Sequence, residues 1–166
     1  MPISFTSARL TITEFDMMDA DDLFACISPA ITVFMPWEPP LSVDALKAQR
    51  RESLVSKRAD DFWFVIRTRD TAECLGSASL TDASAPTPEV GIWLKHAVHG
   101  RGYAGECIKR LCEWTGERFE PRGFIYPVAV DNLPSRRIAE RLGGVVIAHR
   151  SNPKYASVVY RIPRQP

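Results

Sequence analysis

The sequence lacks both the long apolar runs of membrane proteins and the charge imbalance of many nucleic-acid binders. No stretch approaches the ~20 consecutive apolar residues that a membrane helix needs, and the N-terminus has no signal-peptide pattern. Lysine and arginine together number 21 and acidic residues 20, which leaves a formal net charge of +1. Bulk electrostatic binding to nucleic acid needs a larger positive charge. We therefore expect a soluble protein that binds neither membranes nor nucleic acid.

Cysteine and histidine are scarce, and their positions match no common metal motif. The four cysteines form no CxxC pair, which is typical of a reduced, cytoplasmic protein. His96, His99 and His149 fall in different predicted elements, and no further ligand stands at a useful spacing. The sequence therefore predicts a cytoplasmic protein without a bound metal.

A length of 166 residues suits one domain, residues 1–166, with a proper hydrophobic core. Hydrophobic periodicity and turn residues divide it into alternating elements. Strands are expected at residues 8–14, 62–66, 74–80, 90–94, 123–130, 145–148 and 155–162. Helices are expected at residues 19–27, where Pro29 ends the helix, from Ser42 to 54, from the glycine loop to 119, and at 131–142. This order predicts a mixed α/β sheet in which antiparallel strands come first.

The most informative stretch is the loop Gly100-Arg101-Gly102-Tyr103-Ala104-Gly105, which joins the strand at 90–94 to a long helix. Glycine allows positive φ and a close approach of the backbone to a ligand. The first N–H groups of a helix have no intrahelical acceptor, and the helix dipole adds partial positive charge there. Together these features predict a phosphate-binding loop.

The glycine loop fits three known kinds of loop to different degrees: a dinucleotide-binding loop, a Walker loop and a plain glycine turn. It matches GxGxxG literally, so a dinucleotide-binding oxidoreductase must be considered. However, residues 95–99 separate the strand from the first glycine, and only 35 residues follow Asp131, too few for the further parallel strands of that fold. A Walker loop is excluded because no Gly-Lys-Ser/Thr sequence occurs. A plain glycine turn without a ligand is the third interpretation.

Two segments taken together resemble a known family. GIWLKHAVHGRGYAGE followed by VAVDNLPSRRIAERLGG is similar to the GNAT N-acetyltransferases, in the RimJ/RimL-type branch. The family pattern Gln/Arg-x-x-Gly-x-Gly/Ala falls on residues 99–104, with His99 in place of Gln or Arg. The resemblance implies an α+β fold with a mostly antiparallel central sheet, one splayed pair of parallel strands and helices on both faces.

The resemblance also implies acetyl-CoA as the acetyl donor. Its pyrophosphate would lie on the backbone N–H groups of residues 99–104, and its pantetheine arm between strands 90–94 and 123–130. Those strands separate in the family, and this would explain Pro127, which cannot donate to a sheet ladder. The residues expected to contact the cofactor are Ile92, Trp93, Leu94, His99, Gly100, Arg101, Gly102, Tyr103, Ala104, Asn132 and Ser135.

The implied reaction is direct attack of a primary amine on the thioester, without a covalent enzyme intermediate. Glu89, just before the cofactor strand, is the candidate base, and its alternative is a solvated loop carboxylate. Ser135 is the candidate donor to the departing thiolate, and its alternative is a hydroxyl that serves the helix start. Many family members carry a tyrosine four residues further on, where this chain has Ala139. Asn132 is expected to hold pantetheine amides or cap the helix.

The acceptor is an amine on a protein, a peptide or a small molecule, and the sequence does not select among them. Met35 and Trp37, in a proline-rich loop, are expected to wall the acceptor pocket, although an aromatic that anchors the loop fits equally. An exposed Trp37 would also allow a homodimer. The alternative functions are a non-catalytic acyl-CoA-binding regulatory domain and the dinucleotide-binding oxidoreductase.

Overall fold

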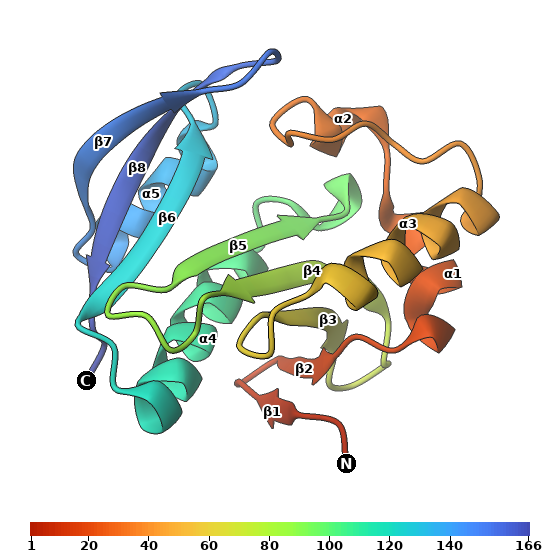
Figure 1. Cartoon of the computed structure of the whole chain (residues 1–166), viewed down its shortest axis with the longest axis horizontal. Helices are drawn as coiled ribbons and strands as arrows, with labels where there is room; N and C mark the ends of the chain where they lie inside the picture. The colour runs from red at the N-terminus through yellow and green to blue at the C-terminus, as the bar shows by residue number, and fades with distance from the viewer.

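A single eight-stranded sheet forms the centre of the computed structural model, which describes residues 1–166 (Figure 1). The strands are β1 (Ser4–Thr6), β2 (Leu10–Glu14), β3 (Phe62–Thr68), β4 (Cys74–Thr81), β5 (Glu89–Leu94), β6 (Gly123–Ala129), β7 (Val145–Ser151) and β8 (Ala156–Pro163). The α-helices are α1 (Ala20–Cys26), α2 (Pro29–Thr32), α3 (Val43–Ser56), α4 (Tyr103–Phe119) and α5 (Leu133–Arg141). Two 3-10 turns, η1 (Met17–Asp19) and η2 (His96–Val98), complete the set. None of these helices combines the length and the apolar character that crossing a bilayer requires.

The strand order is β1-β2-β3-β4-β5-β6-β8-β7. Every neighbouring pair is antiparallel except β5 and β6, which are parallel. Parallel neighbours need a crossover connection, and α4 supplies it. The prediction of a mostly antiparallel sheet with one parallel pair is confirmed. A dinucleotide-binding fold is not formed, because such a fold needs a run of parallel strands.

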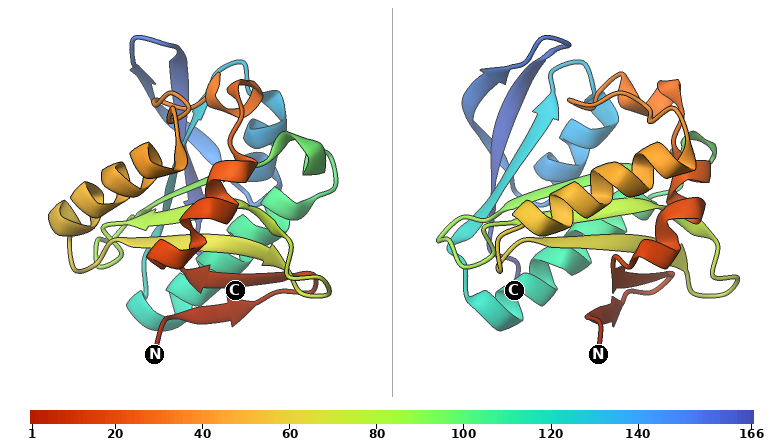
Figure 2. Two further views of the ribbon diagram at one scale, coloured as in Figure 1. Left: turned by 90° about the vertical axis from the view of Figure 1, so that its right-hand side faces the viewer. Right: turned by 45° about the vertical axis from the view of Figure 1, so that its right-hand side comes forward.

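Helices cover both faces of the sheet, as predicted (Figure 2). On one face α4 and α5 pack onto the strands and bury the main core of 24 residues, which includes Ile108, Leu111 and Trp114. On the other face α1 and α3 bury a small cluster of Leu23, Cys26, Leu46, Val65 and Cys74. The strands therefore have two buried faces in the middle of the sheet, while the edge strand β7 is exposed along its whole length.

Two short elements were not predicted, and one proline was misread. The sequence analysis missed β1 and α2, each of which is too short to show a period. Pro29 was expected to end a helix, but α1 already ends at Cys26 and Pro29 is the first residue of α2. A proline fits there because a first-turn N–H has no intrahelical acceptor.

The predicted caps are confirmed at two helix ends and wrong at one. The Ser42 side chain accepts from Ala45 N at 3.1 Å and begins α3. Gly143 has φ 82° and ends α5. Asp19, by contrast, makes no side-chain cap for α1; its carboxylate accepts instead from Asp16 N in the capping box of η1.

The parallel pair meets at one place only, Glu89 opposite Ile125, and then separates (Figure 1). Ile125 N donates to Pro88 O at 2.9 Å, so the N–H groups of alternate residues from Ile125 onward point to the β5 edge. Pro127 is the next residue with this direction, and β5 is no longer paired there. The β6–β8 ladder, by contrast, continues through Pro127 opposite Val159. The explanation offered for Pro127 therefore agrees with the structure.

A glycine on β4 makes this part of the sheet sensitive to substitution. Gly76 has φ 154°, and a Cβ there would lie 2.2 Å from the carbonyl oxygen of Trp93 on β5. We expect Gly76→Ala to lower the free energy of unfolding by about 1–3 kcal/mol, because backbone must shift to relieve the clash. Urea unfolding measures the change. Gly105→Ala is the control, since its Cβ would find only an ordinary contact at 3.9 Å to Ile138; equal losses would contradict the prediction.

Candidate active site

The loop between η2 and α4 presents a run of unpaired backbone donors. Gly100 and Gly102 have φ 78° and 80°, which only glycine adopts without strain. None of the six N–H groups from Gly100 to Gly105 donates to another atom of the chain. The expectation that His99 contributes its N–H is wrong, because that group donates to His96 O at 3.1 Å. The free run therefore begins one residue later than predicted and extends into the first turn of α4.

Arg9 and Glu106 fasten this loop to the N-terminal strands. Arg9 Nη1 donates to the Arg101 carbonyl at 3.0 Å, and Arg9 Nε donates to Glu106 Oε2 at 2.7 Å. The Arg9 guanidinium also lies 4.3 Å from the centroid of the Tyr103 ring. Glu106 Oε1 accepts from Ser7 Oγ at 2.6 Å and from Arg9 N at 2.7 Å. The loop conformation is thus held by residues far away in the sequence.

The charge state of Glu106 suits this role. Burial alone would raise its pKa, but hydrogen bonds from Ser7 and Arg9 and the charge of Arg9 hold the pKa below the usual carboxyl range. The carboxylate is therefore ionised at neutral pH, and it lies in the first turn of α4, where the helix dipole favours negative charge. The His99 ring is held as well, since its Nε2 lies 2.8 Å from Leu94 O.

The two faces of β5 have different surroundings. Side chains alternate along a strand, so Val90, Ile92 and Leu94 pack against the main core under α4. Glu89 and Trp93 lie on the opposite face, where the Trp93 ring packs against the small cluster. The second edge of β5 has no strand partner beyond Glu89. On the side facing β6, no strand uses the backbone groups of Ile92, while Leu94 O already contacts the His99 ring at 2.8 Å. The expectation that Trp93 offers its backbone there is wrong, because its carbonyl faces Gly76 on β4.

Glu89 lies where the parallel strands part. It is the first residue of β5, and its Oε2 accepts from Arg150 Nη1 of β7 at 3.3 Å. Both side chains are about half exposed, 44% for Glu89 and 54% for Arg150. The sequence analysis did not anticipate the arginine, because the two residues are 61 positions apart.

Ser135 is paired with a tyrosine that the sequence analysis missed. Ser135 Oγ and Tyr126 Oη are hydrogen-bonded at 2.6 Å, and either atom can donate. Tyr126 is buried, and burial raises its pKa to about 12, so the phenol keeps its proton at neutral pH. Asn132 Oδ1 accepts a hydrogen bond from Ser135 N at 3.4 Å and caps the start of α5. Capping this helix is one of the two roles expected of Asn132. Ala139, the position of the family tyrosine, is fully buried.

A signal for Tyr126 does exist in the sequence. The strand GFIYPVA places Phe124, Tyr126 and Val128 on one face, and a hydroxyl among these apolar side chains needs a hydrogen-bond partner. What the alternation does not reveal is the partner, because α5 approaches β6 only in the folded chain.

The proline-rich loop after α2 lies beside the same opening. The Trp37 and Trp93 rings meet edge to face with centroids 5.9 Å apart. Lys154, in the β7–β8 turn, donates to the carbonyls of Thr32 at 2.7 Å and Trp37 at 3.1 Å and pairs with Glu38 at 2.7 Å. Trp37 and Met35 are both partly exposed, and the homodimer stays a prediction.

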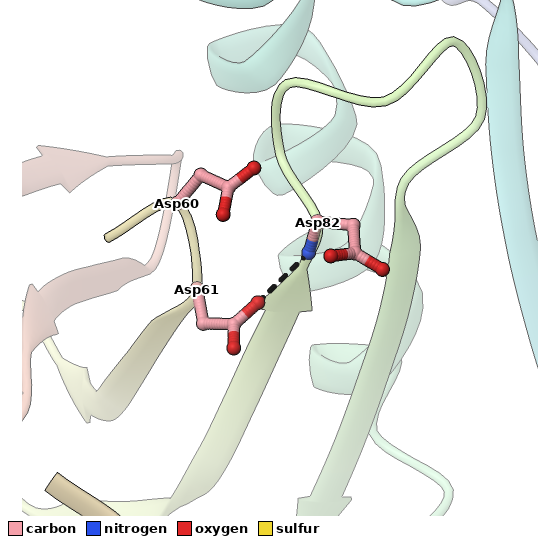
Figure 3. Close-up of side chains that lie close together, drawn as sticks. All are labelled: Asp60, Asp61 and Asp82. Atoms are coloured by element: carbon pink, nitrogen blue, oxygen red, sulfur yellow. Dashed lines mark hydrogen bonds between the residues drawn. The ribbon is translucent and has the colours of Figure 1, made fainter. Parts of the chain in front are cut away.

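A cluster of three acidic residues lies near the N-terminal end of β5, where Glu89 stands. It consists of Asp60, Asp61 and Asp82, each with one carboxylate oxygen within 4.8 Å of the others (Figure 3). Asp61 Oδ1 accepts from Asp82 N at 2.9 Å, the bond that is drawn. Arg58 Nε lies 3.4 Å from Asp60, and Arg58 Nη1 lies 3.1 Å from Asp82. These contacts join the β4–β5 loop, which leads into Glu89, to the start of β3.

Solved structures of acetyltransferases share this architecture. RimL, a ribosomal-protein alpha-N-acetyltransferase, superposes with a TM-score of 0.83 at 18% identity over 98% of this chain and 95% of its own. A GNAT-family acetyltransferase from Bacillus anthracis gives 0.81 at 16% identity over 98% and 99%. A spermidine N-acetyltransferase chimera from Vibrio cholerae and hSSAT gives 0.78 at 18% identity over 95% and 96%. At these identities the likeness concerns the fold.

The sequence itself carries the family assignment. Residues 9–145 match the family described as Acetyltransferase (GNAT) domain, and a comparison with curated proteins finds no match. The matched region contains the glycine loop, the diverging strands and the Tyr126–Ser135 pair. The chain therefore belongs to the GNAT family of acetyltransferases, enzymes that use acetyl-CoA.

Proposed function

We propose that this enzyme transfers the acetyl group of acetyl-CoA directly to a primary amine. The observation that carries the proposal is the run of free N–H groups from Gly100 to Gly105, which follows β5 and η2 in the chain. Unpaired backbone donors at a helix N-terminus suit a pyrophosphate. An unpaired strand edge suits the amide-bearing pantetheine arm, which can hydrogen-bond as an added strand does.

The residues present fit such a donor. Arg101 belongs to the loop and is exposed, and its guanidinium would meet a phosphate. The unpaired edge of β5 offers the backbone groups of Ile92 to the pantetheine amides, and Asn132 caps the start of α5. The bound donor supplies an activated thioester, while the protein positions it and excludes water.

The proton movements fall to Glu89 and Ser135. The attacking amine must lose a proton. Glu89, which stands where β5 and β6 last pair, would accept this proton directly or through a water molecule. The departing sulfur needs a hydrogen-bond donor. Ser135 would donate to it, while the buried, protonated Tyr126 hydroxyl orients the serine at 2.6 Å.

The acceptor is best described as an α-amine of a peptide or protein, or a small amine of similar basicity. An α-amine has a pKa of about 8, against about 10.4 for a lysine side chain. At pH 7 roughly one tenth of the former is neutral, but only about one part in a few thousand of the latter. An α-amine is more often neutral at this pH, so it asks less of a carboxylate base than a lysine amine would.

A second candidate is a non-catalytic acyl-CoA-binding domain. The Glu89–Arg150 ion pair favours it, because one oxygen of the Glu89 carboxylate is already occupied by a hydrogen bond from Arg150 at 3.3 Å. Such a domain would bind coenzyme A but release no thiol with any amine. An acetylation screen across N-terminal peptides, polyamines and other small amines, with thiol release as the readout, separates it from an enzyme.

The first prediction concerns donor binding. We expect calorimetry to show binding of coenzyme A and none of NAD(P), and Arg9→Ala to weaken the coenzyme A affinity about fivefold, or about 1 kcal/mol. The physical reason is that the Arg101 carbonyl and the Tyr103 ring lose the contact that fixes the loop. Arg110→Ala is the control, because Arg110 joins α4 to the Thr6 carbonyl at 3.0 Å without touching the loop. Equal losses in both variants would contradict the role of Arg9.

The second prediction concerns the base. Glu89→Gln keeps the size of the side chain but cannot accept the amine proton, so kcat should fall about 100-fold while the coenzyme A affinity stays unchanged. Glu117→Gln, on the exposed side of α4, is the matched control and should keep full activity. Steady-state kinetics measure both, and a Glu89→Gln enzyme with normal kcat would assign the proton to another group.

The third prediction concerns the hydroxyl pair. If Tyr126 acts only by orienting Ser135, then Tyr126→Phe and Ser135→Ala should each lower kcat about tenfold, and the double variant should lose no more than Ser135→Ala alone. The raised pKa of Tyr126, about 12, means that its ionisation adds no inflection to the rate profile between pH 6 and 10. Additive losses would show that the two hydroxyls act independently.

A further inference from the structure

Away from the acetyl-transfer site, a cavity of about 270 Å³ opens between α1, the end of β3 and the start of β4. Its walls combine two cysteines, Cys26 and Cys74, with two cations, Arg67 and Lys95. The acids Asp22 and Glu73 lie at the same cavity, where they pair with the two cations. No step of the proposed acetyl transfer uses this group of side chains.

The two cysteines are neighbours in space although 48 positions separate them in the sequence. Cys26 Sγ donates to the carbonyl of Cys74 at 3.3 Å. Both residues lie in the small cluster on the α1 side of the sheet, yet each keeps some exposure, 6% for Cys26 and 8% for Cys74. Both residues also line the cavity, which puts them beside solvent-filled space.

The surroundings give the two thiols different characters. Side-chain hydrogen bonding between the two thiols, distinct from the Cys26 contact with the carbonyl, lowers the pKa of Cys26; burial opposes this shift, and the charges of Lys95 and Arg67 add to it. The same hydrogen bond, together with burial, raises the pKa of Cys74. A thiolate-prone cysteine beside a second thiol, within reach of a solvent cavity, is the arrangement of a redox-sensitive pair.

The remaining two cysteines provide the contrast. Cys107 and Cys112 lie on α4 in the main core with no exposed surface. Burial raises the pKa of both, that of Cys112 to about 12. Neither lines the cavity, so they serve as internal controls for thiol chemistry in the same molecule.

We propose that Cys26 and Cys74 form a peroxide-sensitive dithiol that closes to an intramolecular disulfide between α1 and β4. The Cys26 thiolate attacks one oxygen of hydrogen peroxide, the O–O bond breaks, and the displaced hydroxide takes a proton and leaves as water. The Cys74 sulfur then attacks the resulting sulfenic acid, the S–S bond forms, and the second oxygen leaves as water. Two thiols lose two electrons and two protons, and the peroxide is reduced to two water molecules.

The disulfide would act on the acceptor side of the enzyme. Cys26 is the last residue of α1, and α2 begins at Pro29, directly before the loop that carries Met35 and Trp37. The Trp93 ring, which contacts Trp37, packs against the cluster that contains both cysteines. A covalent bond at Cys26 would therefore restrict the base of the acceptor loop, while the glycine loop keeps its own restraint from Arg9 and Glu106.

The experiment maps thiols after mild oxidation. The full-length protein is treated with hydrogen peroxide, free thiols are blocked under denaturing conditions, and the protein is then reduced and labelled with a heavy alkylating reagent. We expect the heavy label on Cys26 and Cys74 and not on Cys107 or Cys112, and dithiothreitol should reverse the change. Cys74→Ser should leave a sulfenic acid on Cys26 that dimedone traps. Cys26→Ser should slow oxidation of Cys74 by at least about tenfold.

Several results would overturn the proposal. These are the absence of a linked Cys26–Cys74 peptide, heavy label spread evenly over all four cysteines, or oxidation of Cys26→Ser at the wild-type rate. The effect on the acceptor loop rests on the proposed function and is read separately: the oxidised enzyme should show an amine KM raised about threefold with an unchanged coenzyme A affinity. If the disulfide forms without this rise in KM, the modification site stands and only the proposed effect on the loop is overturned.

Discussion

The single contact between β5 and β6, Glu89 opposite Ile125, is the constraint on which the functional features depend. A parallel pair that continued would occupy the backbone groups of Ile92 and Leu94 on the edge facing β6. The separation is sustainable because β6 is paired with β8 along its entire length, so the sheet remains one body. Pro127 is compatible with this arrangement only because its missing donor faces the open edge.

A second requirement is that the glycine loop keep its shape while its donors are free. Unpaired N–H groups do not hold a conformation by themselves, and water can satisfy them in many geometries. The Arg9–Glu106 contacts supply the restraint, because they fix the Arg101 carbonyl, the Tyr103 ring and the first turn of α4 together. The N-terminal strands thereby contribute to a site that they do not line.

Features that depend on residues close together in the sequence were predicted more accurately than features that depend on distant residues. The glycine loop and the helix from residue 103 depend on neighbours in the chain, and they were predicted correctly. His99 was assigned a free donor that the 3-10 turn η2 in fact uses. Pro29 was taken as a helix stop although it begins α2, because proline is compatible with both positions and local sequence does not decide between them.

The sequence by itself determined the order of the longer elements, the two faces of the longer strands and the place of the glycine loop, since these depend on periods of two and 3.6 residues and on glycine conformations. Only the tertiary structure decided which side chains meet: Tyr126 with Ser135, Arg150 with Glu89, Lys154 with the Trp37 loop, and Cys26 with Cys74. The reason is physical. These contacts join segments that are far apart in the sequence and that meet only when the helices pack on the sheet. A local sequence pattern therefore does not predict them.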